Sequence, residues 1–559
     1  MSKILFFLLL FFIYHTNLES KINSNNFNQK YVSNYLSALI FSNKKQNLNS
    51  LKYFNSSKPL ISKHEKFLEN YFFSLVENDK IDKAIAELKK YKDSSNTDFF
   101  EAKILLISES IKKKDYSLAL DYLNTLKVIE DNDNFKKITY ETLKNYINLF
   151  LYKKIDNTKN EYGKFSEINY AFQKCYLDIN SSNSYFLNLI NSDDGRDYSR
   201  YLYFYLNNIV RNKDFFSAKQ IASTINVLNS TLLISQSKKF IENKNYNDLI
   251  TPFSCKNPED LLSEFFFLIS NLYNAQNKIK ASNFYLKVSM YLNKKFYFNL
   301  SLLAENYYVT ENFNKSKKVL REFKGKGSFY NWYRIKKIAQ IISIEENEKQ
   351  SLKYIKRELK LFDNPNYKIL FDVANIYKNF EKYDEAINYY NLVLKKIELG
   401  TDTHADVLYR RGSSFERMKI YDSADNDLIK SLEISPGDPY VLNYLAYSWL
   451  ERKYKIDVAM NMLLDAYNYT ENNPYIIDSL GWAYFLIGDY DKAEKYINQA
   501  MQLRPNDPVI MNHYADILWK IDRKLEANYF WKGVLKIGEF KDIDEDELKR
   551  KLIFGLDNL

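Results

Sequence analysis

Small and large apolar residues recur along this chain with a period near 34 residues. One set of small residues comprises Ala304, Ala339, Ala374, Gly412, Ala446, Gly481 and Ala515. Three positions after each of them stands a larger apolar residue, namely Tyr307, Ile342, Tyr377, Phe415, Trp449, Tyr484 and Leu518. Because residues three apart share one face of a helix, this pattern predicts a helix with one buried stripe in every repeat.

A second small residue follows each of the first set after twelve or, once, thirteen positions. This second set comprises Ser316, Ser351, Ala386, Ala424, Ala459, Ala493 and Ala527. Two helices joined by a short turn approach closely only where neither presents a large side chain. The paired small residues therefore predict a helical hairpin in each repeat, with Gly481 facing the helix that carries Ala493.

Short motifs mark the ends of these predicted helices. The segments Tyr383–Ala386, Tyr421–Ala424 and Tyr490–Ala493 each put an acidic residue where a second helix should begin, which suits capping and the helix dipole. Pro439, Pro474 and Pro508 stand where new repeats should start, a position that tolerates a missing amide donor.

The segment Leu480–Tyr484, followed by Ala493, Ala500 and Pro505, resembles a tetratricopeptide repeat. The resemblance implies an all-α fold, a right-handed α-solenoid of helical hairpins. Eight units can be phased, which begin near Leu262, Tyr297, Trp332, Tyr367, Ala405, Pro439, Pro474 and Pro508. The stretch from about Asp438 onwards also resembles the C-terminal part of exported tetratricopeptide proteins of α-proteobacteria.

The same phase returns weakly near the N-terminus, where Ala38, Ser50, Ala84 and Ala119 fit the spacing. We therefore predict degenerate repeats at 21–130 and eight repeats at 262–540, followed by a capping helix and tail at 541–559. Residues 131–261 read as divergent helical repeats with a joint near 190–197, because Asp193–Asp197 is a loop sequence.

Residues 1–20 predict a secretory signal peptide or an N-terminal anchor. The uncharged run Ile4–Ile13 follows a single cation at Lys3 and is short for a membrane-spanning helix. No pair of small residues for cleavage follows it, so the segment could stay uncleaved and associate with a membrane. We expect the protein in the periplasm or cell envelope.

The amino-acid composition narrows the fold classes and site types that this chain could have. Glycine (12) and proline (9) are scarce, which disfavours folds that depend on turns. The net charge of +10 is small beside 80 basic and 70 acidic residues. Cys175 and Cys255 are 80 positions apart, and contacts in a solenoid run mainly between neighbouring repeats. We therefore predict no disulfide between them.

No motif for catalysis, cofactor binding or metal binding is present, and the four histidines stand far apart. His513 reads as a helix-face residue rather than a catalytic base. Pentatricopeptide repeats, which bind RNA, have a similar length, but the export signal and the small-residue pairs favour the tetratricopeptide type. RNA binding and an envelope enzyme of unrecognised type remain the alternatives to a non-catalytic scaffold or adaptor.

Solenoids of this kind bind partners on the concave face, which the first helix of each hairpin lines. Counting by phase places aromatic and polar residues there, and we predict that they bind a partner peptide or helix. They are Asn443, Tyr447, Asp478, Trp482, Phe485, Asn512 and Trp519. The alternative is that these aromatics pack between neighbouring helices.

Overall fold

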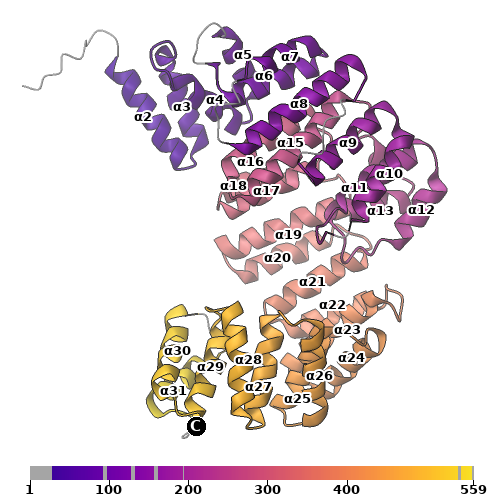
Figure 1. Cartoon of the computed structure of the whole chain (residues 1–559), viewed down its shortest axis with the longest axis vertical. Helices are drawn as coiled ribbons and strands as arrows, with labels where there is room; N and C mark the ends of the chain where they lie inside the picture. Colours follow the sequence, from indigo (N-terminus) through magenta and orange to yellow (C-terminus); the bar gives the residue numbers. More distant parts are fainter. Residues whose placement is uncertain are drawn as a thin grey trace, which may run out of the picture. The chain divides into compact units, whose positions relative to one another are not determined.

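The computed structural model describes residues 28–91, 97–126, 133–155, 162–192, 194–538 and 543–556, with the backbone alone at 179–181. These ranges hold 30 α-helices, one 3-10 helix and no strand, which confirms the all-α prediction (Figure 1). The segment 1–20 lies outside the described residues. None of the described helices combines the length and the apolar character needed to cross a membrane. The chain divides into two compact units, 1–345 and 346–559.

The first unit consists of helices joined by short turns. They are α2 (Gln29–Asn43), α3 (Asn47–Ser56), η2 (Lys58–Leu60), α4 (Phe67–Glu77), α5 (Ile81–Lys90), α6 (Phe100–Lys112), α7 (Tyr116–Asn124), α8 (Asn134–Tyr152), α9 (Lys164–Leu177), α10 (Ile179–Ile190), α11 (Arg200–Arg211), α12 (Phe215–Thr224), α13 (Leu232–Glu242), α14 (Tyr246–Ile250), α15 (Pro258–Ala275), α16 (Ile279–Leu292), α17 (Asn299–Val309), α18 (Phe313–Arg321) and α19 (Ser328–Glu345). The predicted pairs of small residues meet inside these hairpins. The Ser50 hydroxyl donates to the Ala38 carbonyl at 2.9 Å, and the Ser316 hydroxyl donates to the Ala304 carbonyl at 2.9 Å.

Helices α15 and α16 return to pack against much earlier helices of the same unit (Figure 1). The helix α15 contacts α6 and α8, and α16 contacts α4 and α6. Aromatic rings fill this contact, with centroids 5.8 Å apart for Tyr146 and Phe265 and 6.1 Å apart for Phe72 and Phe284. A face of the early helices is therefore covered by later helices of the chain itself.

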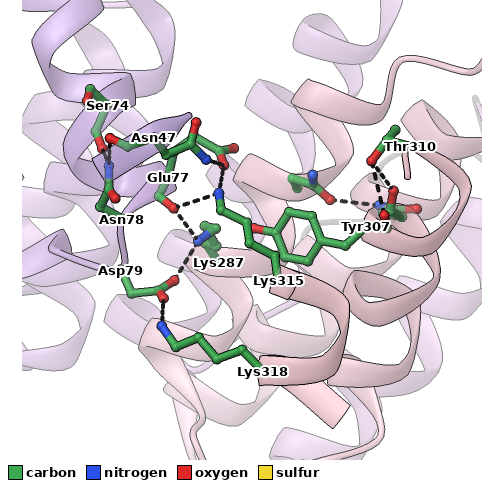
Figure 2. A network of polar contacts seen from close by, with 12 residues as sticks. Asn47, Ser74, Glu77, Asn78, Asp79, Lys287, Tyr307, Thr310, Lys315 and Lys318 are labelled. Carbon is green, nitrogen blue, oxygen red and sulfur yellow. Dashed lines mark hydrogen bonds and ion pairs between the residues drawn. The ribbon is translucent and has the colours of Figure 1, made fainter. Parts of the chain in front are cut away.

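Charged side chains close the same contact at the end of α4 (Figure 2). Asp79 accepts from Lys287 at 2.5 Å and from Lys318 at 2.9 Å, and Glu77 accepts from Lys315 at 3.0 Å. Burial favours the neutral form of Asp79, yet the two lysines outweigh it and hold the pKa of Asp79 below its usual range. These ion pairs join residues more than 200 positions apart.

Cys175 and Cys255 form a disulfide, so the prediction of unpaired cysteines is wrong. Cys175 lies on α9, and Cys255 lies in the loop before α15. That loop runs beside the end of α9, where Lys256 donates to the carbonyls of Tyr176 and Leu177 at 2.8 and 2.9 Å. The prediction assumed a chain that advances steadily, whereas α11 to α14 form an excursion after which α15 comes back beside α8.

The second unit is a regular series of hairpins. Its helices are α20 (Glu348–Leu359), α21 (Tyr367–Asn379), α22 (Tyr383–Leu394), α23 (Asp402–Arg417), α24 (Tyr421–Ile434), α25 (Pro439–Glu451), α26 (Ile456–Tyr469), α27 (Pro474–Leu486), α28 (Tyr490–Leu503), α29 (Pro508–Lys520), α30 (Lys524–Ile537) and α31 (Glu545–Phe554). The three predicted prolines each start a helix. The side chains of Asp438, Asn473 and Asp507 precede them and accept from backbone amides of the first turn.

Gly481 lies where two helices of a hairpin come closest. A Cβ atom at this position would stand 2.6 Å from the Ile497 Cγ1 and 3.0 Å from the Ile497 backbone nitrogen. The second set of small residues is buried throughout, with at most 1% of any of them exposed. The sequence-based account of close helix contact is therefore confirmed for this hairpin.

Candidate partner-binding face

The first helices of consecutive hairpins in the second unit lie side by side: α23 contacts α25, α25 contacts α27, and α27 contacts α29. We call the surface formed by α21, α23, α25, α27 and α29 the first-helix face. The predicted binding residues all lie on three of these helices, α25, α27 and α29.

Trp482 is the centre of an aromatic stack on this face. Its ring lies 4.6 Å from Phe485 on the same helix and 4.2 Å from His513 on α29, with interplanar angles of 18° and 16°. The indole N–H donates to the Glu451 Oε1 at 2.8 Å, so a third helix fixes its orientation. Trp482 and Phe485 are both half-buried, which leaves part of each ring accessible.

His513 is bound to Asp478 beneath this stack. Its Nδ1 lies 3.0 Å from Oδ1 and 3.1 Å from Oδ2 of Asp478, and both side chains are buried. Burial opposes the charged imidazole, but the Asp478 carboxylate outweighs it and raises the pKa of His513 above its usual range. Asp478, predicted to contact a partner, is thus engaged within the protein. His513 was not among the predicted binding residues, although it stands two positions before Ala515 on a helix of this face.

Asn443 and Asn512 occupy equivalent positions on α25 and α29, three before the small residue of each repeat. The Oδ1 atom of each is buried, and no described group donates a hydrogen bond to it. A buried acceptor without a donor is costly, so such atoms usually serve a partner or an ordered water. Tyr447 is half-buried on α25 near Glu451, and burial raises its pKa.

Trp519 differs from the other predicted residues, because α31 ends against it. A Cβ atom on Gly555 would stand only 1.9 Å from the indole Cζ2, so the backbone there touches the ring. Lys551 of α31 also reaches into α29 and donates to the Asp516 Oδ2 at 2.7 Å. Much of the surface that Trp519 would offer to a partner is therefore occupied by the predicted capping helix.

A cationic cluster on α21 and α23 was not among the predicted residues. Lys378 donates to the Ser413 hydroxyl, and burial together with Arg410 and Arg417 lowers the pKa of Lys378 to about 8. Lys378 stands four positions after Ala374, in the column that holds Phe485 and Trp519. Extending that column by three repeats from Phe485 would have found it.

The described part of the chain has no group of three or more His, Cys, Asp or Glu side chains that could hold a metal ion. The first-helix face thus offers aromatic rings, unpaired amide oxygens and a cationic cluster. These groups can bind a segment of another protein by stacking, hydrogen bonding and charge.

Two stretches in the C-terminal half of the chain match models of one repeat type. Two tetratricopeptide-repeat models match residues 408–537 and 367–395. The peptidyl-prolyl cis-trans isomerase CYP7 of Saccharomyces cerevisiae is 31% identical over 86 residues, which are 15% of this chain. The chain spans 22% of the length of that relative.

Several solved structures align with parts of this chain at low sequence identity and low TM-score. A tetratricopeptide repeat protein of Parabacteroides merdae is 17% identical, with 46% of this chain and 97% of that chain covered and a TM-score of 0.38. PilF of Pseudomonas aeruginosa is 19% identical, with 31% and 78% covered and a TM-score of 0.28. TTC0263 of Thermus thermophilus is 18% identical, with 34% and 98% covered and a TM-score of 0.29.

Proposed function

Because this chain is a tetratricopeptide-repeat protein, we propose that it is a non-catalytic scaffold or adaptor that binds a peptide or helix of another protein on the first-helix face. The observation that carries the proposal is the pair of buried amide oxygens of Asn443 and Asn512 that lack donors. They flank α27, which presents Trp482. Backbone N–H groups of a bound segment would satisfy these oxygens.

The partner segment combines an apolar side chain with acidic residues. Trp482 and Phe485 offer accessible ring surface for the apolar side chain. Lys378 on α21 and Arg410 on α23 offer positive charge three and two repeats before α27. Asp406 offsets part of it by pairing with Arg410 at 3.3 Å, but burial of Lys378 beside Arg410 and Arg417 still favours an incoming anion. The early helices of the first unit are a poorer place for this partner, since α15 and α16 cover one of their faces.

Export to the periplasm or cell envelope is part of the same proposal. The apolar run Ile4–Ile13 supports it, and so does the Cys175–Cys255 disulfide, because disulfides persist in oxidising compartments. An uncleaved N-terminal segment would hold the protein at the membrane. A reporter that is active only outside the cytoplasm, fused after Leu559, should be on; a silent reporter on an intact fusion would contradict export.

The binding test uses a quadruple variant in which Asn443, Trp482, Phe485 and Asn512 are all changed to Ala. Each variant replaces the native chain in its own organism, and its partners are captured by cross-linking and identified. Hot-spot truncations commonly cost about 2 kcal/mol or more of binding, on the order of thirtyfold in affinity. We expect the quadruple variant to keep its helicity and lose a specific protein partner.

The matched control changes Leu525 and Tyr529 to Ala, because these side chains are 88% and 73% exposed on α30, a second helix. This control should keep every partner. Full capture by a folded quadruple variant would exclude the first-helix face as the binding surface. Recovery of RNA in place of protein would contradict the scaffold proposal itself.

A further inference from the structure

The first unit contains a cavity of about 690 Å³ that is separate from the first-helix face. Its walls come from α11, α13, α14 with the loops on either side of it, the loop before α17, and the loop before α19 with the start of that helix. Aromatic rings form much of the wall, from Tyr203, Phe240, Phe296, Tyr297 and Tyr330. Cavities of this size hold small organic ligands.

The floor of the cavity is polar and buried. Gln236 and Ser237 on α13 are each 1% exposed and line it. The Gln236 Oε1 accepts from the amides of Phe329 and Tyr330 at 2.9 and 3.4 Å, which fixes the start of α19 against α13. The floor is therefore held in place by hydrogen bonds within the protein.

Two hydroxyl groups at this floor have no hydrogen-bond partner among the described residues. The Ser328 Oγ is buried and unpaired. The side chain of Tyr330 also lines the cavity, and no described residue makes a hydrogen bond with its hydroxyl. A buried hydroxyl normally finds a partner, so a cavity lined by Ser328 and by the Tyr330 hydroxyl is suited to a ligand with polar groups.

The rim of the cavity is mainly cationic. Lys239, Lys295 and Lys326 line it, against a single acidic residue, Asp248. Glu242 lies 3.7 Å from Lys239 and offsets its charge. Lys295 and Lys326 have no ion-pair partner within 4 Å in the described ranges, although Asp260 attracts Lys295 from further away. The Lys326 ammonium lies 4.3 Å from the centre of the Tyr297 ring, so charge and aromatic surface are adjacent.

We propose that this cavity binds a small organic anion whose acidic group is carried on a polar ring, such as an acidic sugar or a sugar phosphate. The ring stacks on the aromatic walls and its hydroxyls bond to Ser328 and Tyr330, while the carboxylate or phosphate pairs with Lys295 and Lys326. Binding here is independent of the partner bound on the first-helix face.

Calorimetric titration of the full chain tests the proposal with four probes: glucuronate, glucose 6-phosphate, neutral glucose and inorganic phosphate. We expect at least one of the two acidic sugars to bind, and to bind more tightly than glucose or phosphate alone. Comparing the two acidic sugars tells a carboxylate ligand from a phosphate ligand. Lack of binding by both at millimolar concentration would overturn the proposal.

Three variants locate the site. The double change Lys295→Gln and Lys326→Gln should weaken binding about tenfold or more, and Tyr330→Phe should weaken it with its fold intact. Lys294→Gln is the matched control, because Lys294 is an exposed neighbour that does not line the cavity. An equal loss in this control would show that binding follows surface charge and would contradict the cavity site.

Discussion

At the residue scale, Gly481 shows why a repeat needs a small residue at a fixed position. The side chain and backbone nitrogen of Ile497 leave no room for a Cβ atom, whereas a Cβ on Gly437 would make an ordinary contact of 3.6 Å with Tyr469. We therefore expect Gly481→Ala to cost about 1–3 kcal/mol by overpacking, and Gly481→Leu to cost more. Thermal unfolding checks this, with Gly437→Ala as the control. Equal midpoints for the two alanine variants would contradict the close approach.

The His513–Asp478 pair predicts a pH dependence, also at the residue scale. The folded state raises the pKa of His513 above the ordinary value of 6.5, so its contribution to stability is complete below that pH and is lost as pH rises through the raised pKa. Unfolding midpoints from pH 5.5 to 8.5 should therefore show a larger advantage of the native chain over His513→Asn at low pH. Asp478→Asn should abolish this trend, and a trend that survives it would contradict the pairing.

At the scale of elements, the contact between α4 and the α16–α18 segment includes one buried and one exposed ion pair to Asp79. Lys287 is 3% exposed and Lys318 is 69% exposed, although both donate to Asp79. We expect Lys287→Met to cost about 1 kcal/mol and Lys318→Met less than about 0.5 kcal/mol, because solvent screens the exposed pair. Urea unfolding at neutral pH measures both. A larger loss of stability for Lys318→Met than for Lys287→Met would contradict the greater burial of Lys287.

The stability that Asp79 gives to the contact between α4 and the α16–α18 segment should depend on pH. Because the pKa of Asp79 is lowered in the folded state, its contribution is present at neutral pH and is lost as pH falls through the folded pKa. The difference between the native chain and Lys287→Met should therefore shrink in acid.

At the scale of the whole molecule, the disulfide closes a long loop within the first unit. The residues joined are 80 positions apart, and cross-links of long loops typically contribute about 2–4 kcal/mol. Cys175→Ser should lower the free energy of unfolding of the oxidised protein by that amount. It should also abolish the mobility shift between reduced and non-reduced gels. The absence of any shift in the native chain would show that the cysteines are unpaired.

The sequence predicted the hairpins well because their determinants are local. Pro474 and Gly481 act within one repeat, so their spacing alone indicates where helices begin and touch. The return of α15 and α16 depends on contacts such as Lys287 with Asp79, which no short motif records. Some contacts of the candidate site could likewise be predicted from local spacing, and others could not. The contact of Trp482 with Phe485 follows from helical spacing, whereas its contact with His513 required the packing of α27 on α29.

The return of α15 and α16 has a consequence for synthesis. Chains emerge from the ribosome N-terminus first, so α4, α6 and α8 are made well before residues 258–292 can cover them. During that interval Phe72 and Tyr146, which are at most 1% exposed in the finished protein, lack the rings that cover them. We therefore expect the incomplete chain to be prone to aggregation until α16 has been made.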